Sequence, residues 1–203
     1  MLVEEGYLKL KKLEGLKLSE INLVNKGNDG QKIMSAIGLK NDSSPLDFED
    51  GDLKTNKFIE GRPSETLWIS QMQNNLIEFE KGLDFYDSWI YKKIRQFIYL
   101  PIDKTRHHII GKPQIISEER FPHLYKKLAI DFNYISKEIK NCIDLKRTLH
   151  TINGPSNYLQ IRTKASKNKY GMYTPMTING HKLKDKYMAF YFKKEFLYNF
   201  LKD

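Results

Sequence analysis

The sequence has one cysteine, no long apolar run and no low-complexity tract, and each absence removes a class of protein. The single thiol, Cys142, excludes an internal disulfide framework and a cysteine-cluster metal site. The five histidines show no zinc-ligand spacing. No apolar run approaches the roughly 20 residues of a membrane span, and the N-terminal stretch contains acids where a signal peptide carries only basic residues. We therefore expect a cytoplasmic protein without membrane contact.

Acidic residues are scarce over residues 160–194, and positive charge gathers there as a result. The chain has a net charge of +9, and this segment holds nine basic residues and one acid, Asp185, so it contributes +8. Tyrosine and phenylalanine side chains lie between the lysines. Such a mixture favours a polyphosphate partner, with nucleic acid ahead of an anionic membrane surface.

The length of the chain predicts one domain over residues 1–203, or one domain with a short arm, and the order of the predicted elements indicates the mixed α/β class. Apolar residues within 118–143 recur at steps of three and four, which indicates a helix with one buried stripe. Apolar and polar residues alternate over 158–164, which indicates a strand with one buried face. We expect helices at 5–22, 30–38 and 118–143, a hairpin within 52–72, a strand within 90–101, strands at 158–164 and 187–192 in one mixed sheet, and a short C-terminal helix.

Four carboxylates occupy the six positions from Asp47 to Asp52, and a lysine, Lys54, follows two residues later. Metal-dependent phosphodiester hydrolysis uses carboxylates to hold Mg²⁺ beside the phosphate, and a nearby lysine can orient the attacking water. On a strand Asp52 and Lys54 share a face, and Asp47 or Asp50 can complete a carboxylate pair. The same residues also suit a solvated turn, which is the commoner role of such a stretch.

The stretch DLKTNKFIEGRPSETLWIS, residues 52–70, resembles the active-site hairpin of the MutH-like family of GATC-specific endonucleases. The stretches NKGNDGQKI, YLPI, IIGKP, YLQIRTKAS and AFYFKKEF resemble further family motifs in the same order. The resemblance implies a restriction-endonuclease-like core, a cleft between two lobes and magnesium as cofactor. Within the family the chain most resembles the C-terminal half of a type II restriction endonuclease with two such domains. That implies double-stranded DNA containing GATC and a sister catalytic domain as partners.

The resemblance assigns catalytic positions, but three of them depart from the family pattern. The metal-binding acid before Leu-Lys falls on Asp52, where the family normally has Glu, and the catalytic lysine falls on Lys54. The second metal-binding acid falls on Asp47, two residues closer than the pattern, and a fourth acid falls on Met34. The second active-site lysine falls on Lys93. Because all three departures affect one metal site, we expect weak metal binding or none, and a degenerate active site.

The DNA-reading positions show no such departure. Arg162 and Lys164 match the family's Arg-x-Lys that enters the major groove, and Tyr191 matches the tyrosine that senses adenine methylation. Periodicity alone favours a packed aromatic at Tyr191. Further DNA contacts are expected from Lys26, Lys167 and Lys169.

Three functions follow as hypotheses. The first is a DNA-binding effector domain that recognises GATC, does not cut, and stabilises the cutting arrangement of a sister domain. The second is an active magnesium-dependent endonuclease that recruits Asp47 or Glu49 for the missing ligand. The third is a general basic module for RNA or DNA. The intact pair Arg162 and Lys164, beside the acid lost at Met34, favours the first.

Overall fold

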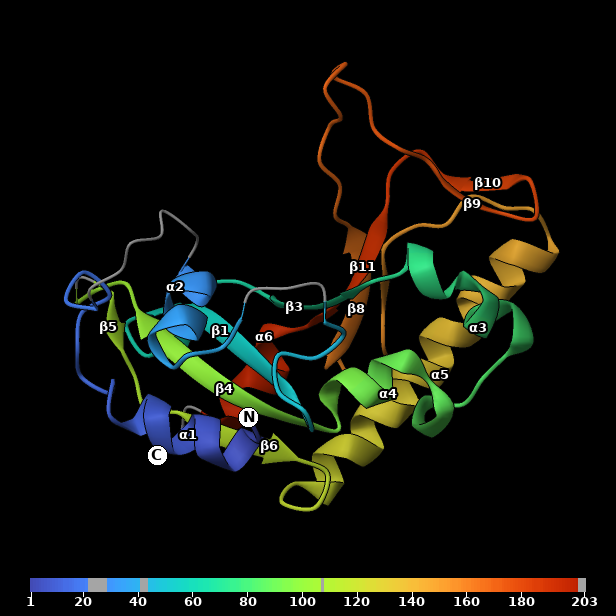
Figure 1. The fold of residues 1–203 in the computed structure, drawn as a ribbon. Coiled ribbons are helices and arrows are strands. Elements are labelled where there is room, and N and C mark those ends of the chain that lie inside the picture. The colour runs from blue at the N-terminus through green and yellow to red at the C-terminus, as the bar shows by residue number, and fades with distance from the viewer. Residues whose placement is uncertain (22–28, 41–43, 107, 201–203) are drawn as a thin grey trace. The chain divides into compact units, whose positions relative to one another are not determined.

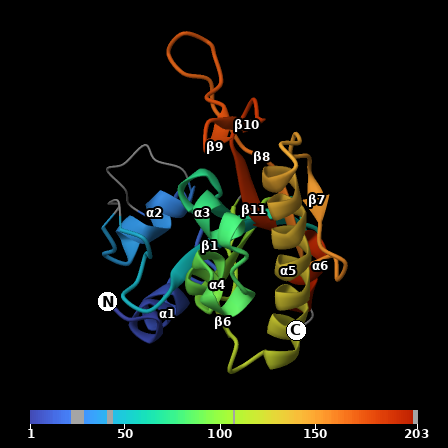
Figure 2. The same cartoon turned by 90° about the vertical axis from the view of Figure 1, so that its right-hand side faces the viewer.

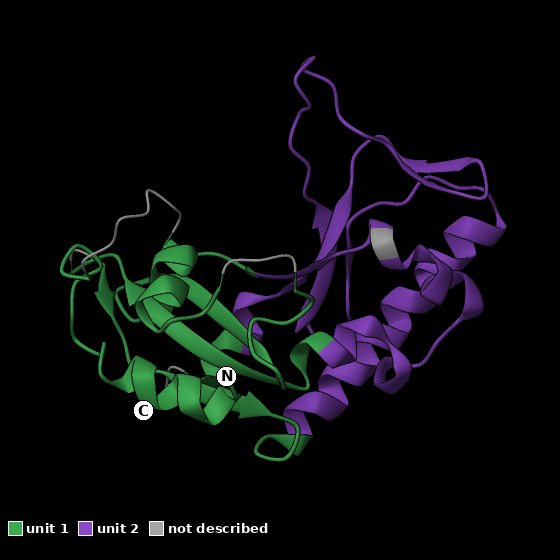
Figure 3. Cartoon of the chain, viewed as in Figure 1, with its two compact units in different colours: residues 1–67, 93–122, 197–203 green, residues 68–92, 123–196 purple. Residues whose placement is uncertain are grey.

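A computed structural model of the protein describes residues 1–21, 29–40, 44–106 and 108–200 (Figure 1). The chain divides into two compact units, coloured separately in Figure 3. Unit 1 comprises Met1–Leu67, Lys93–Pro122 and Leu197–Asp203, and unit 2 comprises Trp68–Lys92 and His123–Phe196. Parallel and antiparallel strands occur with flanking helices, so the predicted mixed α/β class is confirmed.

Unit 1 is built around two parallel strands in register. Asp52 of β1 lies opposite Phe97 of β4, and the pairing continues to Phe58 and Asp103. The six residues 97–102 of β4 are all buried, as expected of a central strand covered on both faces. The elements of unit 1 are α1 (Val3–Lys11), α2 (Asp29–Ala36), β1 (Asp52–Ile59), β2 (Arg62–Pro63), β4 (Gln96–Asp103), β5 (Ile109–Ile110), β6 (Gln114–Ser117) and the 3₁₀ turn η3 (Tyr198–Phe200).

Unit 2 contains an antiparallel sheet and the longest helix. The strand order is β3-β11-β8-β7, and β9 and β10 form a separate hairpin. The helix α5 lies beside β11 in Figure 2, and the rings of Phe132 and Phe190 stack 5.8 Å apart between them. The elements assigned mainly to unit 2 are β3 (Leu67–Gln71), η1 (Gln73–Asn75), α3 (Leu76–Lys81), η2 (Phe85–Asp87), α4 (Trp89–Ile94), α5 (Pro122–Asp144), β7 (Ile152–Asn153), β8 (Leu159–Thr163), β9 (Met176–Ile178), β10 (His181–Lys184), β11 (Met188–Phe192) and α6 (Lys194–Leu197).

Most predicted helices and strands are present with shifted ends. The helix expected at 118–143 begins at Pro122, because proline fixes φ and suits the first turn of a helix. The strands expected at 158–164 and 187–192 are β8 and β11. The helix expected at 5–22 is shorter, since α1 ends at Lys11 and Gly15 follows in the left-handed region.

The prediction for residues 90–101 was wrong in its first half. Residues 89–94 form α4, because Ser88 caps its start by accepting a hydrogen bond from the Tyr91 N–H (3.1 Å). The strand β4 begins at Gln96 and continues through Pro101 to Asp103. Pro101 has no N–H to donate, but its carbonyl accepts a hydrogen bond from Gly111 (2.9 Å), so the strand continues past it.

The prediction of one sheet was also wrong, and the hairpin predicted within residues 52–72 is present with a second strand of only two residues. The strand β1 turns at Glu60 and Gly61, both in the left-handed region, and pairs with the two-residue β2. Past Pro63 the Ser64 N–H still donates to the Lys57 carbonyl (2.9 Å), and the segment then leaves β1. The next strand, β3, pairs instead with β11, so the predicted strands divide between two sheets.

Candidate functional site

The predicted catalytic acid and lysine meet at the start of β1. The Lys54 ammonium lies 2.7 Å from Oδ2 of Asp52, since alternate residues of a strand share a face. Both side chains are buried, with 1% of Asp52 and 5% of Lys54 exposed. Gly51 lets the preceding loop pass close to β4, because a Cβ there would lie 2.6 Å from the Gln96 carbonyl oxygen. The sequence prediction that Asp52 and Lys54 share a face is confirmed.

Two further predicted residues join this pair within unit 1. Lys93, at the end of α4, places its ammonium 3.2 Å from the same Oδ2 of Asp52. The Asp47 backbone N–H donates to Oδ1 of Asp52 (3.1 Å), and Oδ2 of Asp47 accepts from the Leu53 N–H (2.9 Å). We call the four side chains of Asp47, Asp52, Lys54 and Lys93 the ion-pair cluster.

The pKa values of the two carboxyls of the ion-pair cluster are shifted in opposite directions. Burial and the neighbouring Asp52 together raise the pKa of Asp47 to about 6, against the opposing effects of the Leu53 N–H and Lys54. Burial also raises the pKa of Asp52, but Lys54, the hydrogen bond with Asp47 and Lys93 together lower it to about 2. Asp52 is therefore the permanent anion of the cluster, and Asp47 is the group whose pKa lies at about 6.

Mg²⁺ would have to compete with the protein's own hydrogen-bond donors for the carboxylate oxygens of this arrangement. It needs free carboxylate oxygens, yet three of the four oxygens of Asp47 and Asp52 already accept hydrogen bonds from the protein, two of them at Asp52. Both ammonium groups of the cluster pair with Asp52. Within the described ranges, no group of three or more His, Cys, Asp or Glu side chains is placed to hold a metal ion. The geometry is that of an internal ion-pair network, and magnesium binding stays a prediction.

The other candidates for the missing ligand point elsewhere. Asp50 accepts hydrogen bonds from the Val3 N–H (2.8 Å) and the Gln96 amide (3.3 Å). Glu49 pairs with the N-terminal ammonium of Met1. Met34 lies on α2 and packs, partly buried, against the apolar core of unit 1. None of the three adds an oxygen ligand to the ion-pair cluster.

The predicted DNA-reading residues lie on the sheet of unit 2. Arg162 and Lys164 are exposed at the end of β8, where the buried residues Leu159 and Ile161 precede them. The Arg162 guanidinium lies 4.3 Å from the ring centre of Tyr191 on the adjacent β11. The Lys164 ammonium lies 4.4 Å from the ring of Trp68 on β3. Each cation therefore rests on an aromatic face, which favours a defined orientation over free rotation.

Tyr191 combines the two interpretations offered by the sequence. Its side chain is almost fully buried, as expected of a packed aromatic, and its ring also supports Arg162. Burial raises the pKa of Tyr191, and the adjacent Arg162 opposes this shift. Its response to adenine methylation stays a prediction.

The remaining predicted contacts lie on the loop after β8. Lys167 and Lys169 are exposed, and their ammonium groups lie 5.7 Å from the ring of Tyr173 and 4.9 Å from the ring of Tyr170. Lys26 falls outside the residues that the structure describes.

Sequence reasoning missed two residues beside Lys164. Trp68 supplies its aromatic support, and the Gln71 amide donates to the Lys164 carbonyl (3.3 Å). Gln71 and Lys164 also line a hollow of about 210 Å³ with Ala165, Ser166, Thr174 and Tyr187. A tryptophan inside a predicted strand was the available signal for such a contact, but Lys164 is 96 residues away from it in the chain.

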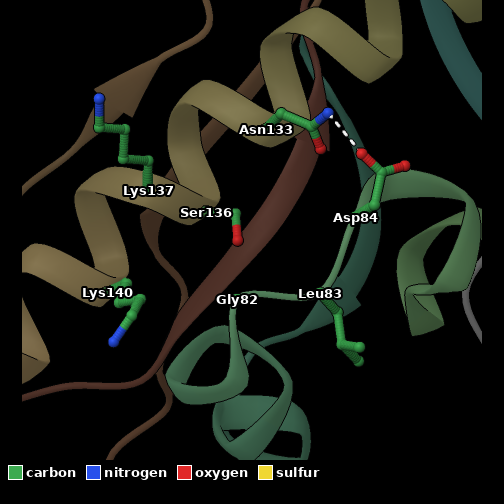
Figure 4. A pocket seen from close by; sticks show the side chains of 7 residues that line it. All are labelled: Gly82, Leu83, Asp84, Asn133, Ser136, Lys137 and Lys140. Carbon is green, nitrogen blue, oxygen red and sulfur yellow. Dashed lines mark hydrogen bonds between the residues drawn. The ribbon is translucent and has the colours of Figure 1, made fainter.

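A second hollow of unit 2, of about 280 Å³, lies along α5 (Figure 4). Its wall includes Asn133, whose amide donates to Asp84 (2.9 Å), and Lys140, which pairs with Asp144 (2.8 Å). None of the residues singled out from the sequence lines it.

No model of a known protein family and no curated protein matches this chain. No helix in the part of the chain that the structure covers has both the length and the apolar character needed to cross a bilayer.

Proposed function

We propose that this protein binds duplex DNA at GATC sites through unit 2, and that it acts as a non-cleaving effector domain of a type II restriction endonuclease. One observation carries the DNA-binding part of the proposal. Arg162 and Lys164 project from one end of β8, each held on an aromatic ring, in the segment with nearly all the net charge of the chain.

This arrangement suits base reading for a physical reason. Arginine and lysine donate to the O6 and N7 acceptors of guanine in the major groove, and the orientation of these side chains determines how well they distinguish guanine from other bases. A cation already stacked on a ring loses less rotamer freedom on binding than a free side chain does. Lys167 and Lys169, on the exposed loop, suit phosphate contacts that hold the protein on DNA of any sequence.

The non-cleaving part of the proposal rests on the ion-pair cluster. A metal-dependent nuclease needs carboxylates open to Mg²⁺ beside the scissile phosphate. Here Asp52 is bonded to two ammonium groups, and Met34 stands where the family carries another acid. The GATC sequence and the sister catalytic domain rest on the resemblance of the chain to the MutH-like family.

Paired alanine variants test base reading. We expect Arg162→Ala and Lys164→Ala each to weaken binding to a GATC duplex by about 1–3 kcal/mol, with a smaller loss on a duplex of permuted sequence. Lys167→Ala should weaken both duplexes alike, because a phosphate contact carries no sequence information. Lys137→Ala, on the exposed side of α5, is the control for a lysine outside the segment. Equal losses on both duplexes for Arg162→Ala would overturn base reading.

A magnesium-dependent GATC nuclease is the second candidate, and one observation favours it. The structure brings Asp47, Asp52, Lys54 and Lys93 together, as the family's active site requires. Mg²⁺ would then have to displace the ammonium groups from Asp52. Efficient cleavage by the purified protein, lost in Lys54→Ala, would establish this candidate in place of the effector.

A further inference from the structure

The loop between β8 and β9 presents an exposed apolar tip. Tyr170 is 70% exposed, the largest fraction for any large hydrophobic side chain in the described residues, and Met172 is 59% exposed. In Figure 1 this loop extends well beyond the strands of its own unit. Large apolar side chains that are exposed together are unfavourable in water, and such exposed patches mark binding sites.

The tip is held in a defined shape by Asn168. Its side-chain oxygen accepts the N–H of Tyr170 (2.9 Å) and the N–H of Met172 (3.0 Å). Its backbone N–H donates to the Met172 carbonyl (2.8 Å), and Gly171 adopts the left-handed φ of +77° that the tight turn requires. Because the turn is formed before binding, little further conformational entropy is lost when it binds.

Cations lie beside the aromatic rings of this loop. Lys169 lies 4.9 Å from the ring of Tyr170, while Lys167 and Lys186 lie 5.7 Å and 4.1 Å from the ring of Tyr173. Duplex DNA offers the complementary pattern, since apolar base faces lie between two rows of phosphates. Proteins that deform DNA insert apolar wedges at base steps while basic side chains hold the neighbouring phosphates.

We propose that Tyr170 and Met172 form a wedge that inserts at a base step of the bound duplex, with Lys167 and Lys169 on the flanking phosphates. This proposal rests on the proposed DNA binding by unit 2 and adds deformation of the duplex to it. Unstacking a step costs free energy that depends on its sequence, so the wedge selects deformable steps without a hydrogen bond to any base.

The test compares Tyr170→Ser/Met172→Ser with Ile77→Ser, which removes a 61% exposed apolar side chain from α3 of the same unit. Each protein is titrated onto a GATC duplex with 2-aminopurine at successive positions in and beside the site. We expect the double variant to bind at least about tenfold more weakly, as for loss of a base-stacking aromatic, and Ile77→Ser to bind like the wild type. The wild type should raise 2-aminopurine fluorescence at one step, Tyr170→Phe should retain that rise, and the double variant should lose it.

The outcomes separate the wedge from DNA binding itself. If the wild type binds the duplex, and the double variant binds equally well with the same fluorescence, the wedge is wrong and the proposed function stands. If the wild type binds no duplex, both proposals are refuted. Vesicles with anionic lipids are the competing partner. Binding to them that needs Tyr170 and Met172, with duplex binding unaffected by the double variant, would assign the tip to a membrane surface instead.

Discussion

Replacing Asp47 with asparagine tests the electrostatics of the ion-pair cluster. Asp47 sits beside the anionic Asp52, and burial is the main cause that raises its pKa from 3.8 to about 6. The native state therefore holds a proton on Asp47 more tightly than the unfolded chain does. A neutral amide keeps an oxygen for the Leu53 N–H and removes the second carboxylate charge.

The sign and size of the effect follow from the pKa difference. A carboxyl with a raised pKa in the folded protein contributes stability that is fully present below about pH 3.8 and is lost as the pH rises through about 6. The rise of about two pKa units corresponds to about 3 kcal/mol at most, since one unit is 1.36 kcal/mol. Because Asp47 is only partly buried, we expect Asp47→Asn to be more stable than the wild type by about 1–2 kcal/mol at pH 7.5, and about equal to it at pH 4.

Urea unfolding of both proteins at pH 4, 5, 6 and 7.5 measures this difference. The free energy of unfolding of the variant should overtake that of the wild type between pH 4 and pH 7.5, with an unchanged m-value. Adding Mg²⁺ should not reverse the order at pH 7.5. A wild type more stable than Asp47→Asn at pH 7.5, or a difference independent of pH, would refute the proposed electrostatics.

Two further predictions concern buried charge. Lys54→Met leaves Asp52 buried with the Lys93 ammonium still beside it, so we expect a loss of about 3 kcal/mol in the free energy of unfolding by urea. The double variant Asp52→Asn/Lys54→Met should largely restore that stability. Equal stability of Lys54→Met and the wild type would contradict this prediction. Asp131 is fully buried in α5 and accepts hydrogen bonds from the N–H groups of Tyr158 (2.7 Å) and Leu159 (2.8 Å) at the start of β8. A Cβ on Gly154 would overlap the Asp131 carboxyl, so Gly154→Ala should lower the melting temperature and weaken GATC binding. Gly180 has open space around it but a left-handed φ of +74°, so Gly180→Ala should lower the melting temperature without weakening DNA binding.

Local patterns predicted those parts of the fold that depend on neighbours in the chain. The stripe of α5 and the alternation of β8 follow from which face of an element is buried. The meeting of Asp52 and Lys54 follows from the same two-residue period. The start of α4 was missed because its cap, Ser88, lies just outside the apolar run that suggested a strand.

Pairing between distant strands could not be predicted in the same way. The hydrophobic pattern of β3 suits either sheet, and only the short β2 ladder and the contact with β11 decide its place. For the same reason Trp68 was not expected beneath Lys164. The approach of Lys93 to Asp52 came from the family resemblance, since 41 residues separate them and no local period relates them.

Binding and cutting measured in the same tube test the central claim most directly. The purified protein is incubated with a labelled GATC duplex or a permuted duplex in Mg²⁺, and the bound fraction and the strand length are read together, with Asp52→Asn as the active-site control. We predict tighter binding to the GATC duplex, a steep fall in affinity with salt, intact strands, and the same binding by Asp52→Asn. Magnesium-dependent cleavage that Asp52→Asn abolishes, or equal affinity for both duplexes, would contradict the account.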